Sequence, residues 1–103
     1  MPGVQPIVHR LDEVIRDVLP GLHFGIKYRR AFYGLPDLGW VIELAPYFVS
    51  VNVVFHGGAD FTVPPPLGDF GRSRYVKIRT SDEASSPTLL ALLEQAGQTR
   101  GWT

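Results

Sequence analysis

The first regular pattern in the chain is an amphipathic segment over Ile7–Leu19. Its apolar residues, placed at about 100° per residue, fall in one arc of roughly 140°. Charged residues fill the opposite arc, which predicts a helix with a broad buried face. Pro6 suits the first turn of this helix, and Pro20-Gly21 ends it.

A second helix is predicted near the C-terminus. Ser86 is a natural N-cap and Pro87 a natural first helical residue. The leucines of residues 89–93 and Ala96 are expected to form its buried face, and Gly97 is expected to end it.

Between the two helices, apolar and polar residues alternate with the period of a strand. The alternation predicts strands over Trp40–Ala45, Phe48–His56 and Tyr75–Thr80. The aromatic segment Phe24–Tyr33 is interrupted by glycine and by cations, and it is predicted to form one short strand or two irregular extended pieces. Gly34–Gly39 is a predicted turn, because proline presets φ and glycine adopts left-handed conformations.

The alternation also assigns a face to each strand residue. In Trp40–Ala45 the even-numbered residues are predicted to point one way, and Val41, Glu43 and Ala45 the other way. In the next two strands, the residues expected to face the helices are Val49, Val51, Val53, Phe55, Val76 and Ile78.

The connection Gly57–Arg72 contains Pro64-Pro65-Pro66. Three consecutive prolines cannot donate to a ladder, so this segment is expected to leave the sheet as a stiff extended stretch. The whole order predicts a single α+β domain over residues 1–103, with N- and C-terminal helices packed on one face of an antiparallel sheet of about four or five strands. The opposite face stays partly open, and function is expected there.

Composition narrows the function classes. The chain has 103 residues, with ten basic and ten acidic side chains and no cysteine. Balanced charge argues against binding to nucleic acid or to a membrane surface, and the lack of cysteine excludes disulfides and cysteine-bound zinc. No apolar run reaches the ~18 residues of a membrane span, and residues 1–10 lack the apolar stretch of a signal peptide. We therefore expect a small cytoplasmic protein with no membrane partner.

The order and spacing of several segments resemble the YdhG-like family of small bacterial domains of unknown function. The segments that carry the resemblance are Ile26–Tyr28, the turn before Trp40, Val53–Ala59, Gly71–Arg79, Ser81–Glu83 and Leu89–Ala96. The resemblance implies a compact α+β domain. Some relatives are described as intracellular iron chaperones similar in role to frataxin, so iron is the cofactor that it implies. The family supplies no catalytic motif, and this chain departs from its pattern at Pro64-Pro65-Pro66, whose role stays open.

Seven of the ten lysines and arginines lie in residues 27–30 and 72–79, and neither segment contains an acid. A cationic surface with aromatic and small polar neighbours suits a phosphate or a carboxylate. The alternative is a solvated outer face, on which acids such as Glu43 pair with the cations. The candidate ligand-binding residues are Lys27, Arg29, Phe48, Asn52, Arg72, Arg74, Tyr75, Lys77 and Arg79.

A candidate metal site lies on the first predicted helix. His9, Glu13 and Asp17 recur every four residues on its polar arc, and imidazole and carboxylate ligands suit divalent iron or zinc. The alternative is ordinary helix surface, because Arg10 and Arg16 share the arc and lower its affinity for a cation.

A third candidate is His56, at a predicted strand end, with Asp60 nearby. The alternative is a turn residue with a backbone partner.

The leading hypothesis is a binding or carrier module that holds a small anion or a metal complex on the open face. The alternatives are iron-chaperone-like binding on the first helix and a homodimer or partner subunit, with Phe48 and Tyr75 in the interface. An enzyme is the least favoured class, because the chain contains no Gly-x-Ser-x-Gly, no phosphate-binding glycine loop and no His-Glu-x-x-His.

Overall fold

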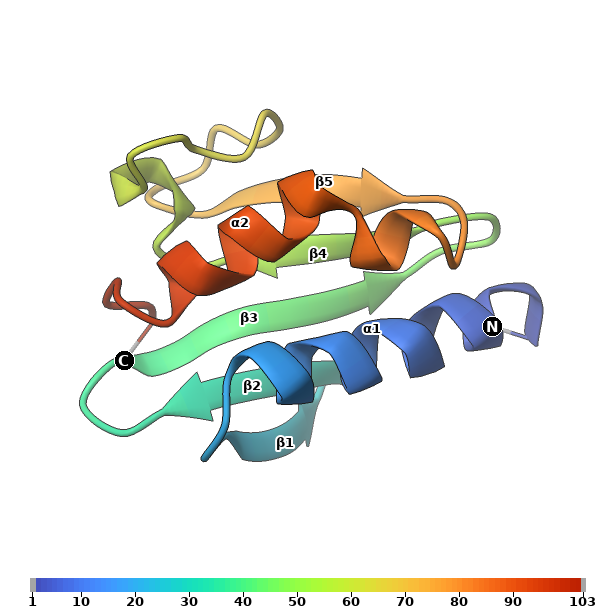
Figure 1. Ribbon diagram of the computed structural model, residues 1–103, viewed down its shortest axis with the longest axis horizontal. Coiled ribbons are helices and arrows are strands. Elements are labelled where there is room, and N and C mark those ends of the chain that lie inside the picture. The colour runs from blue at the N-terminus through green and yellow to red at the C-terminus, as the bar shows by residue number, and fades with distance from the viewer. Residues whose placement is uncertain (1, 103) are drawn as a thin grey trace.

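The computed structural model describes residues 2–102. Two helices cover one face of a five-stranded antiparallel sheet (Figure 1). The strands follow one another in sequence order across the sheet, so that β1 and β5 are its two edges. The elements are α1 (Gln5–Val18), β1 (His23–Lys27), β2 (Arg30–Leu35), β3 (Gly39–Pro46), β4 (Val51–Phe55), β5 (Arg74–Ile78) and α2 (Pro87–Ala96), with 3₁₀ turns η1 (Pro2–Val4), η2 (Gly58–Asp60) and η3 (Glu83–Ser85). The predicted α+β class and sheet are confirmed.

The helix ends follow the local sequence. The Ser86 hydroxyl accepts the backbone N–H of Leu89 at 3.2 Å, which caps α2 as predicted. The helix ends before Gly97, but this glycine has a φ of −69° and forms no left-handed cap. A Cβ there would lie 2.7 Å from Leu19 Cδ2, so the Leu19 side chain would have to shift.

The core lies between the helices and one face of the sheet. Val51, Val53 and Phe55 of β4 are fully buried, and Val51 and Val53 pair with Ile78 and Val76 of β5. The predicted face of β4 and β5 is therefore confirmed from Val51 onward.

The start of the predicted strand Phe48–His56 was wrong. Residues 47–50 form the β3–β4 turn, which the Tyr47 N–H closes by donating to the Ser50 carbonyl at 2.8 Å. Val49 is 76% exposed at this turn, so it does not belong to the core. Phe48 is 83% exposed at the same turn and does not lie on the sheet face.

A bulge in β3 overturns the predicted direction of Trp40. Tyr33 pairs with Ile42 while Gly34 pairs with Trp40, so Val41 is an extra residue on β3. Trp40 therefore points away from the helices, opposite to Ile42. Its indole covers Gly25 and Gly34, where a Cβ would lie 3.2 Å and 3.1 Å from ring atoms.

The segment Phe24–Tyr33 contains parts of two regular strands, β1 and β2. Tyr28 and Arg29 form the two-residue turn between them, with φ values of 53° and 62°. Positive φ at both positions matches the right-handed twist of a hairpin. The interrupted pattern is thus a tight hairpin whose turn carries no glycine.

The residues after α2 return to the sheet. β4 ends at Phe55. Beyond this point the C-terminal tail pairs with the start of β3, where Trp40 and Trp102 exchange backbone hydrogen bonds of 2.9 and 2.8 Å. The Gly101 N–H donates to the Leu38 carbonyl at 2.8 Å, and a Cβ at Gly101 would overlap the Trp40 carbonyl oxygen. A glycine is therefore needed for this approach.

The long connection between β4 and β5 leaves the sheet, and it returns only where Leu67 bridges Tyr75. None of the helices formed by residues 2–102 combines the length and the apolar character that crossing a membrane requires.

Candidate functional site

The face of the sheet opposite the helices, here called the open face, carries polar and aromatic side chains. Phe32, Glu43, Val54 and Tyr75 lie side by side across β2 to β5, and Ala45, Asn52 and Lys77 form the neighbouring row. Lys77 Nζ donates to Asn52 Oδ1 at 3.2 Å. Asn52, Tyr75 and Lys77 are therefore on the open face, where the alternation predicted them.

Lys27 also lies on the open face. Its ammonium is 4.4 Å from the ring centroid of Trp40, 5.7 Å from Phe32 and 5.8 Å from Trp102. These are cation–π distances. Among the described residues Lys27 has no carboxylate partner, since none of the ion pairs within 2–102 includes it.

The two basic segments do not form one patch. Residues 27–30 lie near the β1 edge of the sheet, and residues 72–79 lie at the β5 edge. Arg29 is in the β1–β2 turn, and Arg79 is exposed beyond the end of β5. Arg74 lies on the helix side of β5, beside Phe55, and its guanidinium donates to the carbonyls of Gly71 and Ser73. The nine candidate residues are thus dispersed.

The C-terminal tail links the two basic segments. Arg72 donates to Asp60 Oδ2 at 2.7 Å and to the Arg100 carbonyl at 2.6 Å, while Lys27 lies against the Trp102 ring. Arg72 therefore holds the tail against η2. Asp60 pairs with Arg72, so the candidate residues His56 and Asp60 have different partners.

Three residues meet at the end of β4. His56 Nε2 lies 3.2 Å from Glu43 Oε1, and His56 Nδ1 lies 3.3 Å from Ser73 Oγ. The first contact has the length of an ion pair, but Nε2 has no hydrogen-bond partner among the described residues. Glu43 also accepts a 2.8 Å hydrogen bond from Arg30 Nη1. We call Ser73, His56 and Glu43 the relay.

Glu43 is only 7% exposed in this arrangement. Burial by itself raises the pKa of its carboxyl, but the adjacent side chains of His56 and Arg30 outweigh burial and lower the pKa below its ordinary value. The carboxylate is therefore ionised at neutral pH.

Aromatic rings fix the plane of the imidazole. The ring of Phe32 is parallel to that of His56, with a 3° interplanar angle and 5.9 Å between centroids. Trp102 is 5.7 Å from His56 at 45°. Phe32 and Trp102 are themselves 6.2 Å apart, so the three rings form one triangular cluster.

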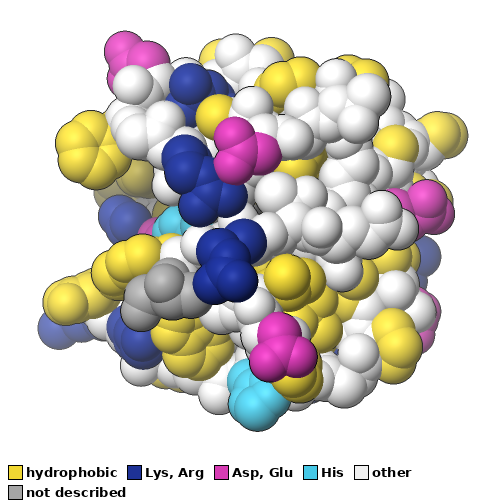
Figure 2. All heavy atoms as spheres, turned by 90° about the vertical axis from the view of Figure 1, so that its left-hand side faces the viewer, with side chains coloured by type: hydrophobic (Ala, Val, Ile, Leu, Met, Phe, Trp, Pro, Cys, Tyr) yellow, Lys and Arg dark blue, Asp and Glu magenta, His cyan; other side chains and the backbone are white. Residues whose placement is uncertain are grey.

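A hollow of about 700 Å³, here called the recess, opens over the relay. Phe70 and Trp102 stand at it, 88% and 51% exposed. Figure 2 shows this end of the molecule, with cationic and hydrophobic side chains around a hollow in which a histidine is visible. The residues that line the recess are His56, Phe70, Gly71, Arg72, Ser73, Gly101 and Trp102.

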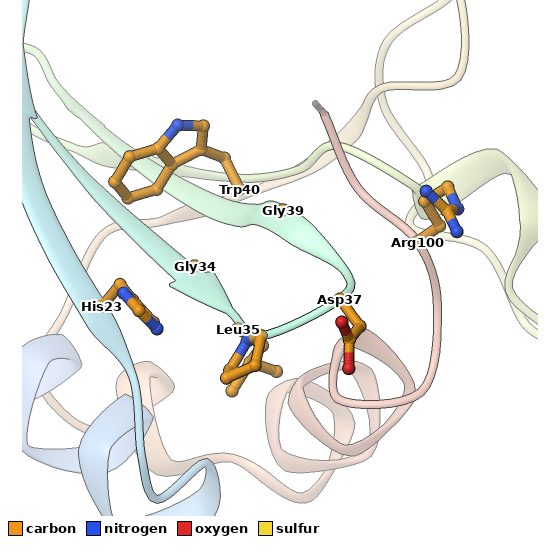
Figure 3. Close-up of a pocket in the computed structure, with 8 residues that line it drawn as sticks. His23, Gly34, Leu35, Asp37, Gly39, Trp40 and Arg100 are labelled. Atoms are coloured by element: carbon orange, nitrogen blue, oxygen red, sulfur yellow. The ribbon is translucent and has the colours of Figure 1, made fainter.

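A second hollow of about 610 Å³ lies at the β2–β3 turn (Figure 3). Figure 3 shows His23, Asp37 and Arg100 coming from β1, the turn and the tail. Within residues 2–102, no hydrogen bond or ion pair joins these three side chains. This hollow therefore lacks the connected polar groups of the recess.

The candidate metal residues stay on the surface of α1. Arg10 lies 3.7 Å from Glu13, while Asp12 binds Arg16 at 3.0 Å and accepts the Tyr33 hydroxyl at 2.7 Å. In the part of the chain that the structure describes, no three His, Cys, Asp or Glu side chains come together as metal ligands. His9, Glu13 and Asp17 are thus not gathered into a ligand set.

The comparisons with protein-family models, with curated proteins and with solved structures find no match to this chain. The resemblance to the YdhG-like family therefore stays a prediction from the residues alone.

Sequence reasoning missed most of the recess. Glu43 was considered only as a partner for surface cations, and Ser73, Phe70 and Trp102 were not singled out. One signal was available, because Glu43 is a lone acid within the apolar run Trp40–Ala45. An acid there requires partners, and these come from distant segments.

Proposed function

We propose that the protein is a binding module that holds a small planar anion in the recess. The observation that carries this proposal is that two exposed aromatic side chains, Phe70 and Trp102, line the recess together with the polar side chains of His56 and Ser73. Exposed aromatic groups beside a few polar groups are typical of ligand sites, because a flat ligand covers the rings while the polar groups fix its orientation.

The charges around the recess favour an anion. Glu43 is paired with Arg30 and Asp60 with Arg72, so these two carboxylates are each balanced by a cation. Lys27, at the Trp102 ring, adds a positive charge without a carboxylate partner among residues 2–102. The local field therefore attracts a carboxylate or a phosphate.

Phenyl phosphate is a suitable probe, since it combines a flat ring with an anionic group. Both tryptophans of the chain lie near the recess or at its wall, so their fluorescence reports its occupation. We expect saturable quenching by phenyl phosphate and weaker responses to two control ligands. Inorganic phosphate supplies only the anionic group, and benzyl alcohol supplies only the flat ring.

Phe70→Ala should weaken this binding by about 1–2 kcal/mol, a roughly five- to thirtyfold higher Kd, because one stacking surface is lost. Phe48→Ala is the matched control, since Phe48 is equally exposed but lies at the β3–β4 turn. Equal Kd values for the two variants, or no saturable quenching of the unaltered protein, would reject the proposal.

Self-association is a second candidate, and a separate observation favours it. β1 is an edge strand, and within or beside it Phe24, Ile26 and Tyr28 are 48%, 64% and 85% exposed. An exposed apolar edge is a template for pairing with another chain. This edge suits a homodimer better than Tyr75 does, because the Leu67 backbone already bridges Tyr75.

Iron binding on α1 and a cytoplasmic location stay predictions from the sequence. The first rests on the family resemblance, and His9 offers the imidazole for it.

A further inference from the structure

We infer that Ser73 is a base-activated nucleophile that takes an acyl group from an aryl ester held in the recess. His56 is the base, and Glu43 positions it. The inference rests on the proposed function for the place of the aryl group, but the reactivity of Ser73 follows from the relay alone.

The arrangement of the relay assigns a role to each nitrogen of His56. Glu43 is an ionised carboxylate 3.2 Å from Nε2, so its negative charge favours the neutral tautomer with the proton on Nε2, although this contact is not a directional hydrogen bond. Nδ1 is then an acceptor, and the Ser73 hydroxyl 3.3 Å away donates to it. This is the order nucleophile, base and orienting carboxylate found in triads, with the two ring nitrogens exchanged.

Burial makes the relay rigid. The side chains of His56 and Glu43 are 10% and 9% exposed, and the buried ring of Phe32 lies parallel to the imidazole. Arg30 holds the second oxygen of Glu43 at 2.8 Å, so the carboxylate keeps one orientation. A nucleophile at the wall of a recess, with a fixed base behind it, is preorganised for attack on a bound ester.

The chemistry balances with water as the second reactant. Ser73 Oγ bonds to the ester carbonyl carbon while its proton moves to His56 Nδ1, and Glu43 stabilises the resulting imidazolium. The adduct collapses by breaking the bond to the aryl oxygen, which leaves with the proton from Nδ1. Water, deprotonated by the same nitrogen, then attacks the acyl carbon. The bond to Ser73 Oγ breaks, the proton on Nδ1 returns to this oxygen, and a carboxylic acid is released. The products are a phenol and an acid.

A fluorophosphonate probe tests the nucleophile without a reporter ester. Ser73 Oγ forms the P–O bond, fluoride leaves, and the proton goes to His56. Intact-mass and peptide mass spectrometry should find one adduct per chain, on Ser73. Ser73→Ala should abolish it, and His56→Phe, which keeps an aromatic ring in the stack, should slow labelling roughly a hundredfold or more. Ser81→Ala, at an exposed serine, is the control and should label like the unaltered chain.

Glu43→Gln distinguishes positioning from structural support. It should slow labelling by about tenfold and move the pH midpoint of the labelling rate downward, because a neutral amide no longer stabilises the imidazolium. The charged groups around the imidazole are Glu43, Arg30 behind it and Arg72 at the recess. A Glu43→Gln variant that labels more slowly but with an unchanged pH midpoint would contradict the positioning role.

Protection by phenyl phosphate separates this inference from the proposed function. Labelling at Ser73 that phenyl phosphate slows supports both. Labelling that phenyl phosphate leaves unchanged supports the relay and counts against the binding proposal. No adduct on Ser73, or equal labelling of Ser73→Ala, overturns the relay even if phenyl phosphate binds.

Discussion

At the scale of single residues, the charge of Glu43 is the most constrained feature of the molecule. A buried carboxylate is stable only with partners, and His56 and Arg30 supply them. Because the pKa of Glu43 is lowered in the folded state, its charge adds stability above the ordinary glutamate pKa, and that contribution is lost as the pH falls through the folded pKa.

Glu43→Gln should therefore lower the free energy of unfolding by about 1–3 kcal/mol at neutral pH, and the difference should shrink as the pH falls below about 4. Urea denaturation of both proteins across this range measures it. Glu13→Gln, on the exposed face of α1, is the control and should change little at any pH. A difference between Glu43→Gln and the unaltered protein that persists at low pH would contradict this assignment of charge.

From the sequence, a residue could be chosen as a site candidate only where its position along the chain gave a reason. His56 was recognised because it stands at a strand end, but Glu43 and Ser73 reach it from β3 and from the segment before β5. No periodic pattern encodes such a meeting, because it depends on which strand lies beside which and on the side chains at their ends. The cations are the opposite case. They are close together in the sequence, but the fold does not place them on one surface.

At the scale of elements, the sequence predicts which segments form strands, but it does not predict the bulge in β3 or the residue at which β4 begins. The alternation in Val51–Phe55 is strong enough to define one face, and the structure agrees. The bulge at Val41 interrupts the alternation of faces along β3. Val49 lies outside the core because residues 47–50 form a turn before Val51. Both depend on pairing between strands, which a single strand's pattern does not contain.

The C-terminal tail is the element on which the recess depends. Gly101 lies where a Cβ would overlap the Trp40 carbonyl oxygen, so Gly101→Ala should displace the tail and open the wall formed by Trp102. We expect a loss of about 1–3 kcal/mol of stability, faster proteolysis at the tail and a weaker response to phenyl phosphate.

Gly3→Ala is the matched control for Gly101→Ala. A Cβ at Gly3 would make only an ordinary 3.5 Å contact with the Phe48 carbonyl oxygen, so stability, proteolysis and binding should stay unchanged. Equal proteolysis rates for the two alanine variants would show that the tail tolerates the overlap and that the recess does not depend on it.

At the scale of the whole molecule, the meander leaves two unlike edges. At β5 the connection from β4 returns, and Leu67 pairs with Tyr75, so part of that edge is covered. β1 has no such cover among residues 2–102, and it exposes Phe24 and Ile26. Soluble proteins commonly protect a sheet edge with charge or with a covering segment. The asymmetry therefore makes β1 the edge at which the proposed self-association is expected.

Ile26→Lys should abolish this association, because a charge on the edge opposes pairing with a second copy. Light scattering during size-exclusion chromatography should show a concentration-dependent dimer for the unaltered protein and a monomer for the variant, with phenyl phosphate binding kept because the recess does not include Ile26. Val49→Lys is the control, since Val49 is similarly exposed but lies at the β3–β4 turn, and it should remain dimeric. A strict monomer of the unaltered protein at every concentration would refute association through β1 without affecting the binding proposed for the recess.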